Sequence, residues 1–421
     1  MPKFFSFLTL FIALSVFPTR GADPTATSYS YEDCLGSWLP YPTPTAAIET
    51  PDTLTAVFIN HVGRHGARFP SSPNSTFALR RALERADSLG TITPAGKQLL
   101  GLTRYVAQRA HNYWGALDSL GMAEQCGIAS RMFISYPELF IDGNVTAISS
   151  YSPRCVMSMY SFTHQLDRLN NKVEIITSAG RQNSQLMRPF DLNKDYLDFM
   201  RSKVWETPWS DYADTRITAT PLRNVLGKDY PLTLSETRSL ALDEYHFLGG
   251  LAAMGIDVDL SRFLSLDEIN ALWSVYNLRQ YLQRTASVLS TAPADIASPL
   301  VLDLIRTTDE AVAGNSDATV RLRFGHAETL LPLFSLLRLR GAYYLTNYYD
   351  TVGQHFKNFD IVPMAANLQM VLFKSQRGRY YVRFDLNERP IPLLPNDDRI
   401  YLPWSEARDY MVRCLPLYDQ P

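Results

Sequence analysis

Residues 54–70 read Leu-Thr-Ala-Val-Phe-Ile-Asn-His-Val-Gly-Arg-His-Gly-Ala-Arg-Phe-Pro. The first seven are mostly apolar, as in a buried strand, and Arg64, His65 and Arg68 follow where that strand would end. A guanidinium offers planar pairs of donors that fit phosphate oxygens, and a neutral histidine can attack phosphorus. Gly66 lets the backbone come close to a ligand. The stretch therefore predicts phosphoryl chemistry at the end of a strand.

Two later segments repeat this layout of an apolar strand, a polar cluster and a helix. The second leads from residues 145–150 to Arg154, and the third leads from residues 318–324 to His326 and Glu328. Strands that alternate with helices indicate an α/β fold with a mostly parallel sheet flanked by helices. Ligands bind beyond the carboxyl ends of such strands, where helix N-termini attract anions. We therefore expect the three polar clusters to meet at one edge of the sheet.

The helix and strand signals divide the chain beyond its N-terminus into two domains. Residues 23–165 and 306–421 carry most strand signals and form the predicted α/β catalytic core. Residues 166–305 show helix and loop patterns with few strand signals, so we expect a mainly helical insertion that covers the active edge. Near the C-terminus, residues 368–373 and 380–386 flank a short glycine-containing segment, which is typical of a β-hairpin.

Residues 1–22 have the pattern of a signal peptide. Lys3 provides a positive start, residues 4–17 are apolar, and residues 18–22 supply a break and small residues for cleavage. The apolar run is short for a membrane span, and no later segment resembles one. The alternative is a buried N-terminal helix. The pattern favours an exported protein, periplasmic or extracellular, with no membrane span after cleavage.

The overall charge of the chain makes some partners improbable. The 421 residues carry a formal net charge of −2, so the overall charge does not attract the protein to nucleic acid or to an anionic membrane. A polyanionic small molecule would have to be attracted by a local cluster of arginine and lysine. The oligomeric state is left open, with a monomer favoured.

Four cysteines are typical of an oxidising compartment and predict disulfide bonding. They are Cys34, Cys126, Cys155 and Cys414, which allow three pairings that the sequence cannot distinguish. Cys34 and Cys414 lie near opposite ends, so one bridge could tie the termini together. None of the four begins the Cys-x5-Arg loop of thiol phosphatases, which argues against a cysteine nucleophile.

The motif Arg-His-Gly-x-Arg-x-Pro at residues 64–70 resembles the signature of the histidine phosphatase superfamily, in its acid-phosphatase branch. His326-Ala327-Glu328 resembles the distal motif of the multiple inositol polyphosphate phosphatases, where most phytases and acid phosphatases carry His-Asp. Residues 152–155 lie where that group has a third phosphate-binding arginine. The resemblance spans roughly residues 50–390 and implies a phosphoglycerate-mutase-like core.

The resemblance implies a role for each motif residue. His65 would be the nucleophile that forms a phosphohistidine, and Glu328 would protonate the leaving oxygen and later activate water. The residues implied to hold the phosphoryl oxygens are Arg64, Arg68, Arg154 and His326. Nothing in this chemistry requires a metal or a cofactor.

Some of these residues also allow purely structural interpretations. His326 could be a core histidine, and Glu328 a carboxylate favoured by a helix N-terminus. Arg154 could form a structural salt bridge, and His61 could either pack at the strand end or belong to the site.

One further arginine is a candidate for contact with the substrate. Residues 186–190 resemble a family segment near the pocket, so Arg188 is predicted to bind a second substrate phosphate. Arg181 and Lys194 are weaker candidates for the same role, and all three could instead be solvated surface side chains.

Together these features favour an exported, metal-independent phosphomonoesterase that hydrolyses inositol polyphosphates, including phytate, through a phosphohistidine. One alternative is a broad-specificity acid phosphatase or sugar-phosphate phosphatase of the same superfamily. An alternative of another class is a non-catalytic protein that binds phosphate esters. His65 and Glu328 argue against that alternative, because binding alone needs neither a nucleophile nor a proton donor.

Overall fold

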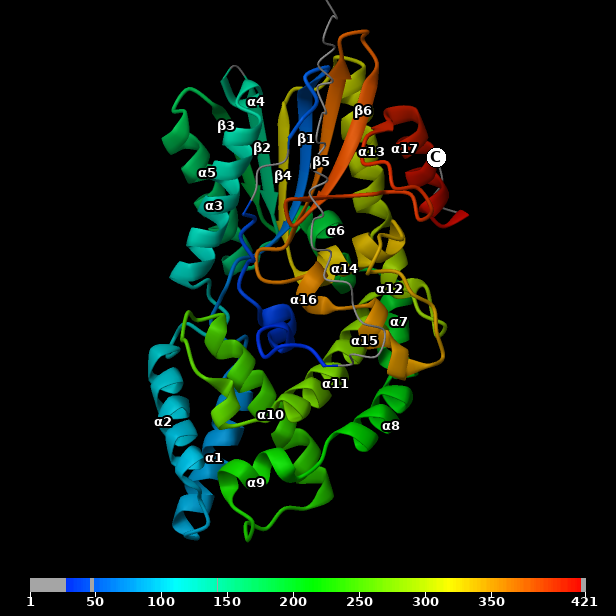
Figure 1. Cartoon of the computed structure of the whole chain (residues 1–421). Helices are drawn as coiled ribbons and strands as arrows, with labels where there is room; N and C mark the ends of the chain where they lie inside the picture. The colour runs from blue at the N-terminus through cyan, green and yellow to red at the C-terminus, as the bar shows by residue number, and fades with distance from the viewer. Residues whose placement is uncertain (1–27, 46–48, 142, 418–421) are drawn as a thin grey trace, which may run out of the picture.

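The computed structural model describes residues 28–45, 49–141 and 143–417, so the predicted signal peptide lies outside the described residues. Within those ranges the strands form one eight-stranded mixed sheet in the order β3-β2-β4-β1-β5-β6-β7, and β8 pairs with β6 (Figure 1). The strands are β1 (Leu54–Arg64), β2 (Asn144–Ser149), β3 (Glu174–Ala179), β4 (Val320–Gly325), β5 (Asn367–Ser375), β6 (Tyr380–Leu386), β7 (Arg389–Ile391) and β8 (Leu402–Pro403).

The predicted parallel sheet is confirmed for the half that carries the motifs. Strands β1, β2, β3 and β4 pair parallel to one another, whereas β5 to β8 are antiparallel. The antiparallel half arises because β5 and β6 form the predicted hairpin, whose turn contains Gly378 at a φ of 76°. Strand β1 continues four residues beyond the apolar run and ends at Arg64, so the motif begins inside the sheet.

Helices cover both faces of the sheet (Figure 1). On one face lie α3 (Ser119–Ser135), α4 (Glu138–Ile141) and α5 (Pro153–Leu169), and on the other lie α13 (Ser298–Val312), α14 (Ala327–Leu336) and α17 (Trp404–Cys414). In strand β1, Phe58 and Val62 pack against the helices α13, α14 and α17, and Ile59 packs on the other face, against α3, α4 and α5. Because both faces are buried, β1 reads as a nearly continuous apolar run rather than an alternating one.

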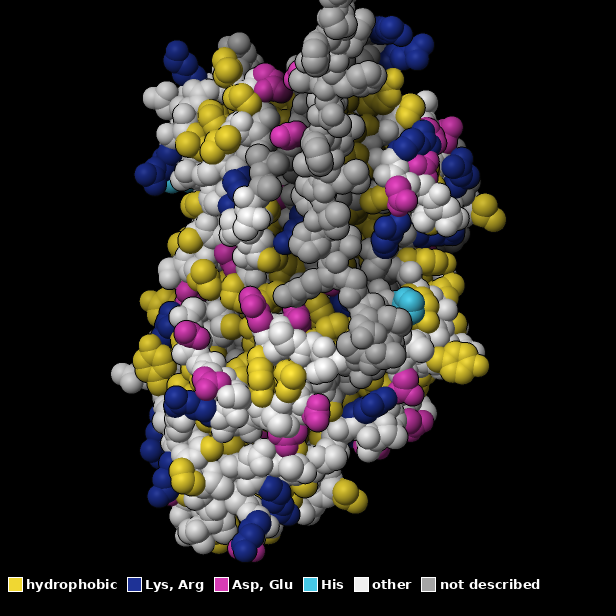
Figure 2. Space-filling view, in the orientation of Figure 1, with side chains coloured by type: hydrophobic (Ala, Val, Ile, Leu, Met, Phe, Trp, Pro, Cys, Tyr) yellow, Lys and Arg dark blue, Asp and Glu magenta, His cyan; other side chains and the backbone are white. Residues whose placement is uncertain are grey.

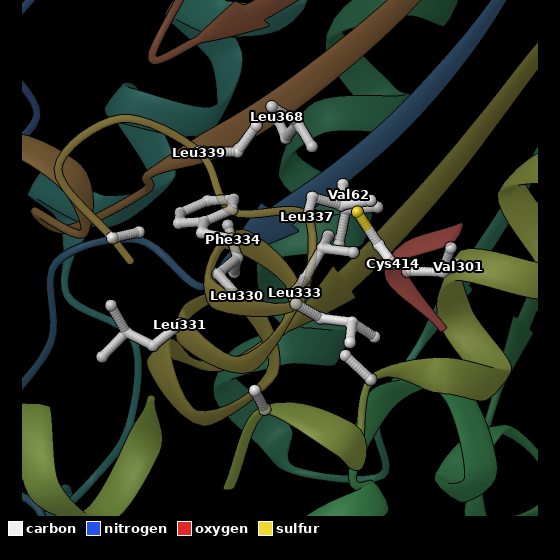
Figure 3. Packing of buried hydrophobic residues seen from close by; sticks show 14 of the residues in the cluster. Val62, Val301, Leu330, Leu331, Leu333, Phe334, Leu337, Leu339, Leu368 and Cys414 are labelled. Carbon is white, nitrogen blue, oxygen red and sulfur yellow. The ribbon is translucent and has the colours of Figure 1, made fainter. Parts of the chain in front are cut away.

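The packing of α14 positions the distal motif, since this helix starts directly after His326. Figure 3 shows Leu333 and Phe334 of α14, and Leu337 directly after this helix, packed with Val62 and Leu368 of the sheet. All five side chains are at most 1% exposed. The apolar contact therefore fixes α14 against β1.

Replacing Phe334 with alanine is expected to lower the free energy of unfolding by about 3–5 kcal/mol, because the ring leaves a cavity in this layer. Urea denaturation measures the change. The control is Ile134→Ala on the surface of α3, where the side chain is 72% exposed and the expected change is within about 0.5 kcal/mol. Equal losses in the two variants would contradict this account of the core.

A second group of helices lies beyond the carboxyl edge of the parallel strands (Figure 1). It contains α1 (Asn74–Ser88), α2 (Pro94–Arg109), α8 (Glu206–Arg216), α9 (Thr220–Leu226), α10 (Leu234–Ala252) and α11 (Leu266–Arg284), and we call it the helical lobe. Helices α1 and α2 pack against α9 and α10 there, although the sequence analysis assigns α1 and α2 to the predicted catalytic core. Conversely, β3 lies within the predicted insertion but pairs with β2 in the sheet. These elements therefore pack with the other part of the predicted division, whose boundaries at residues 165 and 305 stay a prediction.

The predicted disulfide bonding does not occur in the structure, where all four cysteines are free. Cys34 packs in the core of the helical lobe, Cys414 packs beside the sheet, and Cys155 donates its Sγ–H to the Gly325 carbonyl at 3.1 Å. These thiols lie in separate parts of the molecule, so a bridge between the termini is not formed.

The surface has no dominant charge on the face that Figure 2 shows, where acidic and basic side chains are interspersed. This agrees with the small net charge of the chain. None of the helices built from described residues has the length and hydropathy needed to cross a membrane.

Candidate active site

The three polar clusters meet at one edge of the sheet, as the sequence predicts. Arg64 ends β1, Arg154 is the second residue of α5 after β2, and His326 precedes α14 after β4. Strand β4 lies between β1 and β2, so the three strand ends are neighbours. Arg64, His65, Arg68, Arg154 and Glu328 line a common cavity of about 330 Å³.

His65 is arranged as a nucleophile. Its Nδ1 lies 2.9 Å from the Gly66 carbonyl, and a carbonyl only accepts, so Nδ1 carries the proton and Nε2 keeps the lone pair. Burial, reinforced by Arg64, Arg154 and Arg68, lowers the pKa of His65 well below its ordinary value. The imidazole is therefore neutral at physiological pH, with a nucleophilic nitrogen free to attack.

The three motif arginines have no carboxylate partner among the residues that the structure describes. Arg64 donates from Nη1 to the carbonyls of Ser37, Val362 and Pro363 at 2.6–3.0 Å, which fix it without neutralising it. The Nε atoms of Arg64, Arg68 and Arg154 are buried and unbonded. Burial and then the charges of Arg154 and Arg64 lower the pKa of Arg68 to about 9. This uncompensated charge is suited to a bound dianion.

His326 lies between Arg154 and Arg188. Its Nδ1 is 3.3 Å from Nη2 of Arg154, and its Nε2 is 2.8 Å from Nη1 of Arg188 and 3.0 Å from the hydroxyl of Ser150. Burial lowers the pKa of His326 to about 3 against the opposing charge of Glu328, and Arg154 and Arg188 add to the lowering, so the ring is neutral. A neutral imidazole has one lone pair and cannot accept from both guanidinium groups. One arginine therefore keeps donors available for an anion.

Glu328 is the second residue of α14, and its side chain is 35% exposed toward the cavity. One of its oxygens lies 3.4 Å from Nη2 of Arg284 on α11. Burial alone would raise the pKa of the carboxyl, but the opposing interactions, of which that with Arg284 is the largest, lower it to about 2. The predicted proton donor is therefore ionised at physiological pH in this structure.

The comparisons with known proteins agree with this geometry. A family model described as "Histidine phosphatase superfamily (branch 2)" matches residues 57–387, which is most of the chain. The chain belongs to this superfamily. It is therefore a histidine phosphatase, as the motif at residues 64–70 predicts.

Three relatives of this histidine phosphatase illustrate the similarity. "Multiple inositol polyphosphate phosphatase 1" of Homo sapiens is 25% identical over 382 residues, covering 83% of this chain and 77% of that protein. The structure of the Bifidobacterium longum multiple inositol polyphosphate phosphatase with inositol hexasulfate matches at a TM-score of 0.77, 17% identity, and 92% and 99% coverage of this chain and that chain. The phytase of D. castellii matches at a TM-score of 0.72, 15% identity, and 92% and 86% coverage. The two structures confirm the fold.

The cavity of this histidine phosphatase also has a wall that the sequence analysis missed. The wall contains Ser37 and Trp38 from the 3₁₀ helix η1 (Asp33–Trp38), His246 from α10, and Tyr276 and Gln280 from α11. Trp38 and Tyr276 stack with ring centroids 4.4 Å apart. These residues are far apart in the sequence and follow no strand end, so no local pattern marks them. Among the described residues, no group of three or more His, Cys, Asp or Glu side chains could hold a metal ion.

Helix α3 supports the loop that carries His65. Glu124 accepts hydrogen bonds from the backbone N–H groups of Ala67 at 2.7 Å and Tyr41 at 2.8 Å. A Cβ at Gly66 would lie 2.3 Å from the Gly121 carbonyl oxygen of α3. Gly66 is thus required for close packing of the loop on α3, whereas the sequence suggested close approach to a ligand.

The partly buried Glu124 predicts how stability depends on pH. Burial raises the pKa of its carboxyl to about 7, against an ordinary value of 4.5. The folded protein therefore binds this proton more tightly than the unfolded chain, and the stability this provides is complete below pH 4.5 and lost as the pH rises through 7. Thermal unfolding across this range should show wild type losing stability relative to Glu124→Gln. Glu138→Gln, at an exposed position on α4, should remain parallel to wild type.

The structure also locates the less certain candidates. Arg188 lies beside His326 but forms an ion pair with Asp191 at 2.7 Å, so its contact with a second phosphate stays a prediction. His61 faces Phe162 and Phe324 inside the core, which supports its packing role.

Three other candidates were left open by the sequence. Arg154 has no acidic partner among the described residues and therefore forms no structural salt bridge. Arg181 stacks on the Tyr151 ring at 4.5 Å, and Lys194 pairs with Asp198 on the exposed surface of α7 (Lys194–Ser202). Lys194 therefore fits the solvated alternative.

Proposed function

We propose that this histidine phosphatase is an exported phosphomonoesterase that hydrolyses inositol polyphosphates, including phytate, through a phosphohistidine intermediate. The observation that carries the proposal is the cluster of three uncompensated arginines around a neutral His65 with a free Nε2. The names of the human and Bifidobacterium longum relatives support the substrate class. The pattern of residues 1–22 supports export.

In the proposed reaction, the guanidinium groups of Arg64, Arg68 and Arg154 hold the phosphoryl oxygens as charge develops on them. Nε2 of His65 attacks phosphorus, and the bond to the ester oxygen breaks with its electron pair going to that oxygen. Glu328 supplies a proton to the departing oxygen. Water then attacks the phosphohistidine with Glu328 as the base, which releases phosphate and restores His65.

Resolving the products of phytate digestion over time tests the substrate, alongside the rate on glucose 1-phosphate. We expect successive lower inositol phosphates, formed faster than glucose is released. A strong preference for the sugar ester would instead favour the sugar-phosphate alternative. Binding of phytate without release of phosphate would favour the non-catalytic alternative.

A further inference from the structure

Arg284 connects the helical lobe to the proton donor. It is the last residue of α11, and its Nη2 contacts one oxygen of Glu328 at 3.4 Å. Its Nη1 donates to the hydroxyl of Tyr196 on α7. The side chains of Arg284 and Glu328 are 23% and 35% exposed. Glu328 lines the cavity, and Arg284 lies next to that lining through its contact with Glu328.

The surroundings of Glu328 favour its ionised form. The charged and titratable groups that face it are Arg64 of β1, Arg68 of the loop, Cys155 of α5, Tyr196 of α7, Tyr276 and Arg284 of α11, and His326. Arg284 contributes more to ionisation than any other group in this set. A general acid must instead be protonated when the ester oxygen leaves. Substrate binding must therefore change the balance of charge at Glu328.

Of the cations that face Glu328, Arg284 is the one that a substrate phosphate can most readily draw away from the carboxylate. Its contact with Glu328 is single and long, whereas a phosphate can accept two parallel hydrogen bonds from one guanidinium. Arg64, by contrast, is fixed by three backbone carbonyls.

We propose that Arg284 exchanges its carboxylate partner for a second phosphate of the substrate, so that Glu328 becomes a proton donor only when a polyphosphorylated ester is bound. This inference rests on the proposed function and deepens it. The neighbouring phosphate withdraws the guanidinium and adds negative charge, so Glu328 takes one proton from solvent. That proton later passes to the ester oxygen as the bond from phosphorus to His65 Nε2 forms. A monophosphate lacks the second group and leaves Glu328 paired with Arg284.

The pH dependence of kcat tests this exchange with phytate and myo-inositol monophosphate as substrates. In wild type, kcat falls at high pH as Glu328 loses its proton, and this alkaline limb of the profile should lie at higher pH with phytate than with the monophosphate. In Arg284→Gln, the monophosphate limb should move up by about one pH unit or more, and KM for phytate should rise about 10-fold. Arg284→Lys should restore part of the difference between the two substrates.

Arg238→Gln is the matched control. Arg238 likewise bonds one carboxylate, Asp214, and one hydroxyl, Ser210, but neither of these partners lines the cavity, whereas Glu328 does. This variant should behave like wild type with both substrates. Equal losses on both substrates in Arg284→Gln, with unshifted limbs, would overturn the inference while leaving the phosphatase activity in place. If wild type hydrolyses neither ester, the proposed function itself is wrong.

A binding measurement provides a readout without turnover. Calorimetry with myo-inositol hexakissulfate in buffers of different ionisation enthalpy counts the protons taken up on binding. Wild type should take up close to one more proton than Glu328→Gln, which has no carboxyl to protonate. Arg284→Gln should take up fewer protons than wild type, because its Glu328 is already more protonated. Identical proton uptake in wild type and both variants would contradict the exchange.

Discussion

Replacing His65 with alanine is expected to reduce hydrolysis of phosphate esters by at least about 10³-fold, because the covalent step loses its nucleophile. The three arginines remain, so the variant should still bind myo-inositol hexakissulfate. Rapid quenching with radiolabelled substrate, under conditions that preserve acid-labile phosphohistidine, should trap a phosphoenzyme in wild type and none in the variant.

The same experiment separates the mechanisms that the site allows. His111→Ala, at an exposed position, is the control and should retain full activity and labelling. Thermal unfolding should show that His65→Ala is folded. Label on the His65→Ala protein would place the nucleophile elsewhere, and rapid turnover without any phosphoenzyme in wild type would exclude the covalent route. A wild-type protein that binds but never turns over would be a binding protein.

The candidate site residues that the sequence located share one property: each lies at the carboxyl end of a strand or within a few residues after it. Arg64, His65, Arg154 and His326 lie at or just after the ends of β1, β2 and β4, and parallel pairing brings these ends together. Local sequence and a topological rule were therefore sufficient to predict this half of the site.

The other half depends on packing over long sequence distances. Trp38 and Tyr276 stack although 238 residues separate them, and Arg284 reaches Glu328 from the far end of α11. Such contacts follow from how the helical lobe sits on the sheet, which no local pattern encodes. Strand β3 was not recognised as part of the sheet for a related reason. Strand β3 is a mostly exposed edge strand, so it lacks the apolar run that marks a buried strand.

The number of cysteines wrongly predicted disulfide bonds, because composition does not show whether any two thiols lie close together. The four thiols fit an oxidising compartment by number, but each is placed by the packing of its own element. Cys155 illustrates this, because its Sγ lies 3.6 Å from Nε2 of His326. The residue therefore contributes to the support of the distal motif instead of to a bridge.

Replacing Glu328 with glutamine should slow hydrolysis in proportion to how much the leaving oxygen needs a proton. An inositol alkoxide is a poor leaving group, so the loss on phytate should be about 10²- to 10⁴-fold. An activated aryl phosphate releases a stable phenolate, and its rate of phosphoenzyme formation should fall by less than about 10-fold. Single-turnover measurements on both substrates compare the two losses directly, because they isolate the first chemical step from hydrolysis of the phosphoenzyme.

The position of Glu328 makes this comparison informative about geometry as well as charge. Glu328→Asp keeps the acid but shortens the side chain by one methylene, and it tests whether the reach from the second residue of α14 matters. We expect partial activity on phytate, with an alkaline limb in the pH profile that Glu328→Gln lacks. Equal losses on the inositol and aryl esters in Glu328→Gln would remove Glu328 from the role of acid. The proton would then have to come from another group in the cavity, of which the Tyr276 hydroxyl is the candidate, since burial raises its pKa and keeps it protonated.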